Sequence, residues 1–332
     1  MYDPTTLFSY ESHVDPRRVH ARVLLVTLGS FADAGHAQRL IDDHLRNTLT
    51  SHQLGSFDAD QVVSYRDQRP TILFSSDQFG QYRTPSLGLY EVKDAVGENF
   101  LLLAGPEPGL QWERMAAAIT EIVDRHDVAL TVVAGSMPMP APHTRPVVVS
   151  KWATRSELLP GNKPLFGTIL MSSSFPLMMA QRLGEKEHDV IGLTAHVPHY
   201  LADTDFPDAA IALIGGIEDV AKLKIPTIQL AVAAGVVRAQ IGHQVSQSEE
   251  LGEHVEQLEQ SYDEFHRQRE LSAAEEQLPS ADEIGEAAEE FLKTLGEDGP
   301  AAPTPEASTD PDANAPDDGP DAAASGDATP TE

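Results

Sequence analysis

The sequence contains no cysteine, no apolar run long enough to cross a bilayer, and no recognisable secretory signal. Without cysteine, disulfides, thiolate zinc sites and cysteine nucleophiles are excluded. The most apolar stretch, 228–237, is well short of the roughly 20 residues of a membrane-spanning helix. The first residues, MYDPTTLFSYE, have neither the basic nor the apolar region of a signal peptide. We therefore expect a cytoplasmic protein without a membrane segment.

Basic residues are scarce toward the C-terminus. Residues 249–332 hold 25 Asp or Glu and 3 Lys or Arg, which gives -22 of the total net charge of -29. Residues 1–248 hold the remaining 27 acidic and 20 basic residues, an ordinary balance without a Lys/Arg cluster. Because acidic segments repel phosphates, we expect no nucleic-acid partner.

Common cofactor and catalytic motifs are also absent. There is no Walker lysine after a glycine-rich turn and no G-x-G-x-x-G, so nucleotide cradles of those types are excluded. There is no G-x-S-x-G nucleophile elbow. The histidines have no carboxylate or cysteine at metal-ligand spacing. We therefore expect neither a metal nor a cofactor.

Short β-branched runs alternate with amphipathic helical patterns along the first two thirds of the chain. The runs at 22–28, 100–104, 129–134 and 190–195 are typical of buried strands. This alternation predicts an α/β fold, with a mostly parallel sheet covered by helices on both faces. Further expected strands are 54–57, 71–74, 87–92, 147–149 and 167–171; the expected helices are 34–49, 110–125, 176–183 and 208–217.

The chain is predicted to become helical from residue 227. We expect an α/β core domain over 1–226 and C-terminal helices over 227–296, with capping boxes starting at Ser246 and Ser280. Residues 297–332 contain no aromatic, Lys or Arg residue, so they are expected to be a disordered acidic tail. The helix after Ser246 carries an apolar seam at 4-3-4-3 spacing, formed by Leu251, Val255, Leu258, Tyr262 and Phe265. Three partners fit this interface seam: the chain's own α/β body, the preceding helix, or another subunit of a homo-oligomer.

The stretch ALTVVAGSMPMPAPHTRPVVVS (129–150) is the centre of the predicted site. It predicts a strand, a loop stiffened by three prolines, and a second strand. The loop presents His143, Thr144 and Arg145 at the end of a strand, where α/β proteins place their sites.

Other polar residues also follow predicted strands and are expected at the same sheet edge, because parallel strands end on one side. If they converge, Arg145 supplies a two-pronged donor for a carboxylate or phosphate, and His143 or His199 is the candidate acid or base. Tyr200 could close over a ring. The candidate ligand-binding residues are Asp33, Glu107, His143, Arg145, His196, His199 and Tyr200.

Structural roles compete at each of these positions. Asp33 is well placed to cap a helix, and Glu107 lies between two prolines in a turn. His143 and Arg145 could instead tie the loop down through hydrogen bonds within the protein.

Five motifs in order carry a family resemblance: GSFADAGHA (29–37), SYRDQRP (64–70), GPEPGLQW (105–112), GSMPMPAPHTRPV (135–147) and HVPHYL (196–201). Together they resemble the bacterial branch of the proteasome assembly chaperone family, type two, over roughly residues 20–270. The resemblance implies a three-layer α/β body similar to phosphorylases and hydrolases, a homo-oligomer for which a trimer is expected, and a proteasome-related protein partner. Relatives that dock on the proteasome end in a hydrophobic-Tyr-X tail. This sequence ends in TPTE, so we do not expect docking through such a tail.

Two functions remain open. The favoured one is a non-catalytic assembly or scaffolding protein, in which His143 and Arg145 are committed to internal hydrogen bonds and the helices after 227 project. The alternative is a phosphorylase- or hydrolase-like enzyme for a small anionic or nucleoside-like substrate, which requires an open pocket with those side chains pointing in.

Overall fold

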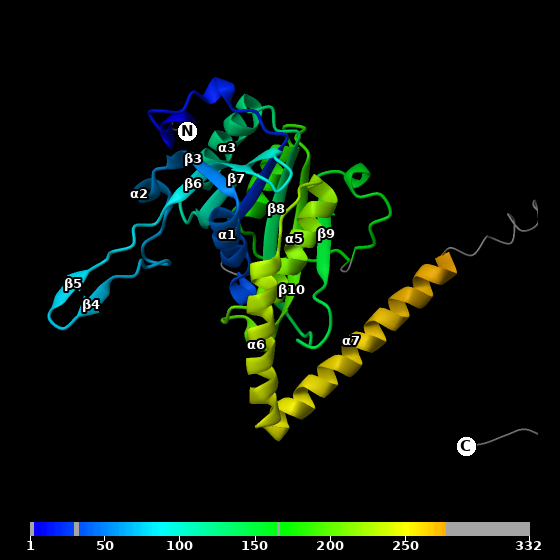
Figure 1. Cartoon of the computed structure of the whole chain (residues 1–332). Coiled ribbons are helices and arrows are strands. Elements are labelled where there is room, and N and C mark those ends of the chain that lie inside the picture. Colours follow the sequence, from blue (N-terminus) through cyan, green and yellow to red (C-terminus); the bar gives the residue numbers. More distant parts are fainter. Residues whose placement is uncertain (1–2, 30–32, 165–166, 277–332) are drawn as a thin grey trace, which may run out of the picture. The chain divides into compact units, whose positions relative to one another are not determined.

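The structure is a computed structural model, which describes residues 3–29, 33–164 and 167–276. Its centre is an eight-stranded sheet in the order β1-β3-β6-β7-β2-β8-β10-β9 (Figure 1). The strands are β1 (Phe8–Tyr10), β2 (Val23–Gly29), β3 (Thr50–Phe57), β6 (Leu87–Lys93), β7 (Asn99–Pro106), β8 (Leu130–Met139), β9 (Val149–Ala153) and β10 (Val190–Pro198).

The sheet is parallel at its centre and antiparallel on its flanks. Strands β7, β2, β8 and β10 pair in parallel, as expected from their continuous apolar runs. Strands β1, β3 and β6 on one side and β9 on the other pair antiparallel, so the sheet is mixed rather than parallel throughout. Because the four central strands run the same way, their C-terminal ends form one edge of the sheet.

Helices cover both faces of the sheet, which gives the three layers implied by the family resemblance. In β2, Val23 and Leu25 belong to one buried core, whereas Leu24, Val26 and Leu28 belong to the other. The first core is completed by α1 (Ala37–Thr48), α5 (Pro207–Ala221) and α6 (Ile228–Ser246), and the second by α3 (Trp112–Arg125) and α4 (Phe175–Gly184). The short helices are α2 (Ala59–Val62) and the 3-10 turns η1 (Pro4–Thr6), η2 (Pro16–Arg18), η3 (Ala34–His36), η4 (Ser156–Leu158) and η5 (His199–Leu201).

Two expected elements differ. The segment 135–139, expected in the stiff loop, continues β8 and pairs with β10. Past Ala134 this strand has β10 but not β2 beside it, so Pro138, which lacks an N–H, is tolerated at an open edge. The expected strand at 167–171 is irregular and exposed chain.

A separate two-stranded hairpin extends from the sheet (Figure 1). It consists of β4 (Leu73–Ser75) and β5 (Gln78–Gly80), paired antiparallel. The rings of Phe74 and Phe79 pack at a centroid distance of 4.8 Å, and both are exposed to solvent. This hairpin is an apolar projection from an otherwise conventional α/β body.

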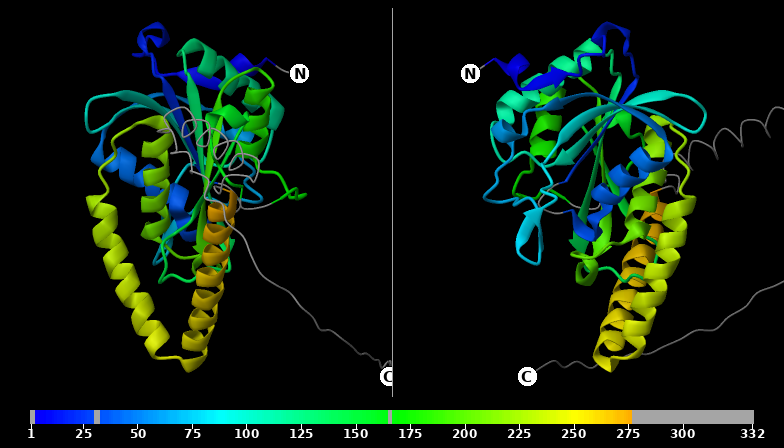
Figure 2. Two further views of the ribbon diagram at one scale, coloured as in Figure 1. Left: turned by 90° about the vertical axis from the view of Figure 1, so that its right-hand side faces the viewer. Right: turned by 60° about the vertical axis from the view of Figure 1, so that its left-hand side comes forward.

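The helix α7 (Glu249–Glu276) follows α6 after a tight turn (Figure 2). Its N-terminal cap is Ser248, whose Oγ accepts a hydrogen bond from the N–H of Leu251, rather than the expected Ser246, whose hydroxyl donates to the His243 carbonyl. Helix α6 and α7 up to Arg269 lie in the same compact unit as the α/β body, whereas a boundary was expected at 226/227.

A second unit begins at Glu270. The capping box expected at Ser280 and the tail expected over 297–332 lie outside the described residues. No helix in the described part of the chain is both long and apolar enough to cross a membrane.

Candidate functional site

Arg145 is bound by two carboxylates of α7. Its Nε and Nη2 donate to Oδ1 and Oδ2 of Asp263 at 2.8 and 2.7 Å, and its Nη1 lies 3.3 Å from Oε1 of Glu259. Glu259 and Asp263 are four residues apart and therefore share one face of the helix. We call these three residues the Arg145 clamp. The two-pronged donor predicted at Arg145 exists, but it holds a helix of the same chain.

Further bonds join α7 to the same loop. The hydroxyl of Thr144 donates to the Glu259 carboxylate, and the hydroxyl of Tyr262 donates to the carbonyl of Pro146 at 3.0 Å. From the predicted seam, Val255 and Leu258 are buried, each with only 7 % of its surface exposed. The central part of the seam is therefore buried by packing within the chain.

The outer positions of the seam are open. Leu251 and Phe265 are each 42 % exposed, and Tyr262 is half-buried. The seam thus has a buried centre and exposed ends.

The clamp shifts the proton affinity of both partners. The hydrogen bonds from Arg145, with its positive charge, lower the pKa of the Asp263 carboxyl below its usual value. In return, the hydrogen bonds to Asp263 and the charge of Glu259 raise the pKa of Arg145. Both groups are therefore held in their charged forms at neutral pH.

His143 is bonded to Tyr200 rather than exposed for chemistry. The Tyr200 hydroxyl accepts a bond from the His143 backbone N–H at 2.9 Å and lies 2.8 Å from its Nδ1. The rings of His199 and of His254, from α7, pack edge-on nearby, with centroids 5.4 Å apart. These four residues form an aromatic cluster.

Burial favours the neutral forms of His143 and Tyr200. Removal from water lowers the pKa of His143 and raises the pKa of Tyr200, in each case disfavouring the charged form. A neutral imidazole bonded to a neutral phenol is an arrangement that holds a loop in place at neutral pH.

The remaining predicted residues support the structure separately. The carboxylate of Asp33 accepts bonds from the N–H groups of Gln38 and Arg39 and so caps α1. Burial raises its pKa, although those hydrogen bonds and one from Ser136 oppose the shift. Asp33 therefore has the helix-capping role that competes with ligand binding at this position, and it lies at the predicted edge of the sheet.

Glu107 and His196 contact neighbouring elements of the fold. Oε1 of Glu107 accepts a bond from the N–H of Phe175 at 2.6 Å, which ties the end of β7 to the start of α4. His196 is buried in β10, where its Nε2 lies 3.2 Å from Oγ of Ser150, and burial lowers its pKa. Of the seven predicted residues, hydrogen bonds and ring contacts bring His143, His199 and Tyr200 together.

The pockets do not coincide with the predicted constellation. Three pockets in the described part of the chain have volumes of about 590, 370 and 570 Å³. Of the seven predicted residues, only Asp33 lines one of them. Among these three, none is the open pocket with inward-pointing His143 and Arg145 that the enzyme alternative requires.

Several functional contacts were not predicted. Glu259, Asp263 and His254 of α7 are not among the predicted site residues, yet each contacts the loop region of the predicted site. A signal was present, because Glu259 and Asp263 lie next to the apolar seam at helical spacing. What sequence spacing could not show was which surface that seam would meet.

Comparison with known proteins places this arrangement in a family. No curated protein matches the chain. A Mycobacterium tuberculosis protein of unknown function, Rv2714, is 36% identical, with a TM-score of 0.77 over 82% of this chain and 95% of that one. A Corynebacterium glutamicum protein of unknown function is 32% identical, with a TM-score of 0.72 over 77% and 97%.

A more distant structure has the same fold. The Mycobacterium tuberculosis proteasome-assembly chaperone homologue Rv2125 is 22% identical, with a TM-score of 0.62 over 70% of this chain and 99% of that one. The model of the PAC2 family matches residues 27–245, which include strands β3 to β10, the loop with His143–Pro146 and the segment Val197–Tyr200. The chain therefore belongs to the PAC2 family.

Proposed function

We propose that this protein is a non-catalytic assembly or scaffolding protein that acts as a homo-oligomer and takes part in proteasome assembly. The observation that carries the proposal is the Arg145 clamp, because the loop predicted as the centre of the site binds a helix of the chain itself through Arg145. The fold shared with a protein named as a proteasome-assembly chaperone homologue supports the choice of partner.

Helix α6 supports the homo-oligomer. One side of it packs into the core through Leu230 and Ile241. The other side exposes Ile228, Val232 and Val236, which are 74, 66 and 56 % exposed. A helix that is apolar on both sides is typical of a buried position. We infer that a second copy of the chain covers this α6 stripe. Residues 228–236 carry no charge, and apart from Gln229 the exposed residues among them that do not belong to the stripe are Ala and Gly, which allow two helices to approach closely.

The oligomer can be tested by light scattering after size exclusion. Replacing Val232 and Val236 together by Glu places two charges on the stripe, and we expect the measured mass to fall toward that of one chain. Val96→Glu is the matched control, because Val96 is 70 % exposed in the turn between β6 and β7. If the double variant keeps the wild-type mass, α6 is not the interface.

The proteasome role requires a separate experiment. The full chain is mixed with recombinant α and β subunits of a bacterial 20S proteasome, and the rate at which assembled particles form is followed by native electrophoresis. We expect faster assembly with the wild type. We expect a smaller gain in assembly rate with Phe74→Ser/Phe79→Ser, which makes the hairpin polar and leaves the eight-stranded sheet untouched. Equal rates with and without the wild-type protein would refute the role.

A further inference from the structure

Three histidines and one tyrosine meet where α7 lies against the body. The ring of His254, from α7, packs against those of His199 and Tyr200 in η5, with centroid distances of 5.4 and 6.4 Å. The Tyr200 ring in turn lies 5.5 Å from that of His199 and 6.0 Å from that of His143. The aromatic cluster therefore spans the contact between the helix and the body, and three of its four rings are imidazoles.

These imidazoles share a property other than metal binding. Within the described part of the chain, no group of three or more His, Asp or Glu residues is arranged to hold a metal ion. Histidine is, however, the side chain that ordinarily changes its charge between about pH 5 and 8. The contact between α7 and the body therefore contains three groups whose charge depends on pH.

The docked position of α7 opposes the uptake of protons by the cluster. His143 is half-buried, and burial lowers its pKa. His199 and His254 are held edge to face at 5.4 Å, so a proton on one ring disfavours a proton on the other. Glu250, four residues before His254, favours a charged His254, but it is exposed and screened by water. Release of α7 separates His254 from His199, so the released state binds more protons and acid favours release.

Two other carboxylates face His143 and act against this effect. The burial of His143 outweighs the charges of Glu259 in α7 and Asp208 in α5, which act to raise its pKa. Each of these carboxylates already has a cation beside it, since Arg145 lies 3.3 Å from Glu259 and Arg238 of α6 lies 3.4 Å from Asp208. A neutral His143 therefore supports docking fully only above the ordinary histidine pKa of about 6.5, and this support is lost as the pH falls.

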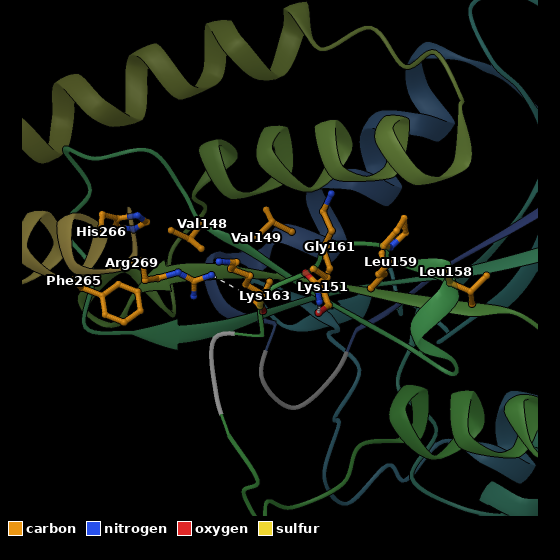
Figure 3. A pocket seen from close by; sticks show the side chains of 13 residues that line it. Val148, Val149, Lys151, Leu158, Leu159, Gly161, Lys163, Phe265, His266 and Arg269 are labelled. Atoms are coloured by element: carbon orange, nitrogen blue, oxygen red, sulfur yellow. Dashed lines mark hydrogen bonds between the residues drawn. The ribbon is translucent and has the colours of Figure 1, made fainter. Parts of the chain in front are cut away.

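The second histidine of α7 has the opposite effect. His266 packs on Tyr262 with a centroid distance of 4.2 Å, beside the pocket of about 590 Å³ that α7 forms with residues 148–151 (Figure 3). After the hydrogen bonds from Arg145, a positive charge on His266 also helps to lower the pKa of Asp263. A proton on His266 thus supports the Arg145 clamp, which makes this residue a control for the aromatic cluster.

We propose that the docking of α7 on the body is sensitive to pH. Between about pH 7 and 5, protons taken up by His143, His199 and His254 weaken the contact at the aromatic cluster, and α7 spends more time released. Release exposes the loop at 143–146, which α7 otherwise covers. The clamp responds only to stronger acid, because Arg145 lowers the pKa of Asp263. This inference does not depend on the proteasome role.

Hydrogen exchange of the full chain at about pH 7.5 and about pH 5.5, corrected for the intrinsic exchange rate at each pH, tests the proposal. We expect the protection of the amides at 254–266 to fall about tenfold relative to β2, since a combined lowering by one pKa unit changes the release equilibrium tenfold. The comparison with β2 removes any change in global stability. In His199→Gln/His254→Gln, whose new side chains stay neutral, the fall should be smaller.

Two matched variants isolate the cluster. His266→Gln removes the second histidine of α7, and His52→Gln removes an exposed histidine of β3, on the flank of the sheet opposite β9. Both should keep the fall in α7 protection seen in the wild type. An equal loss of protection in α7 and β2 would overturn the proposal, as would an undiminished fall in His199→Gln/His254→Gln. A fall abolished by His266→Gln would also overturn it, because the effect would then lie at the other end of the helix.

Discussion

Replacing Leu258 by Ala should release α7 from the body. Of the α7 side chains that the structure describes, only Val255 and Leu258 are buried. Truncating a leucine removes apolar carbons worth about 0.8 kcal/mol each, so the loss is about 2–3 kcal/mol. That loss acts mainly on α7, because the strands and helices of the two cores are not touched. We expect the amides of α7 to exchange with solvent about 30- to 150-fold faster, measured by native-state hydrogen exchange.

Leu251→Ala is the matched control on the same helix. Leu251 is 42 % exposed and should lose far less burial than Leu258, which is 7 % exposed. The two substitutions change helix propensity equally. If both variants speed α7 exchange to the same extent, or if Leu258→Ala lowers global stability without a selective effect on α7, the helix is not docked as described.

Three further predictions concern the clamp, a buried histidine and a glycine. Arg145→Ala should speed hydrogen exchange of α7. Because the pKa of Asp263 is lowered in the folded protein, its ion pair with Arg145 stabilises α7 fully only above the ordinary Asp pKa of about 3.9. Acidification below that pH should therefore also speed hydrogen exchange of α7. Burial lowers the pKa of His126, so the stability of the fold should fall as the pH drops below about 6.5. Calorimetry at several pH values should show that the stability of His126→Gln falls less steeply with decreasing pH than that of the wild type. Gly192→Ala should lower the melting temperature, because its Cβ would lie 1.8 Å from Cε2 of Trp152, and overpacking costs about 1–3 kcal/mol.

Matched variants separate these effects from general destabilisation. Arg155→Ala removes a similar exposed ion pair, with Asp189 at 2.7 Å, and should leave α7 exchange unchanged. Gly192→Ala should lower the melting temperature less in a Trp152→Ala background than in the wild type, because the ring that its Cβ would meet is then absent. A melting temperature for Gly192→Ala equal to that of the wild type would contradict the close contact.

The central sheet and its helices were predictable because local chemistry points to them. The β-branched runs of β2, β7, β8 and β10 predict buried parallel strands, and the structure confirms these four. The flanking pairs were not predicted, since strand direction depends on which neighbours meet in space. The extension of β8 through Pro138 was missed because an open strand edge, invisible in the sequence, removes the penalty of proline.

The position of the candidate site could be predicted from the sequence better than its role. Asp33, Glu107 and His143 do follow strands that end at one edge. The partners of Glu107, His143 and Arg145 come from segments remote in sequence, such as Asp263 for Arg145, more than a hundred residues away along the chain. Spacing within a motif can show that Arg145 needs an anion, but not whether that anion is a ligand or the chain's own helix.

The position of β2 has a consequence for how the chain is made. This strand emerges early in synthesis, yet it pairs with β7, which begins at residue 99, and β8, which begins at residue 130. Until both have left the ribosome, a nascent chain carries an apolar strand with two open edges, which favours wrong pairings. Folding of the body must therefore wait for the middle of the sequence, and slow, long-range closure is the expected rate-limiting event.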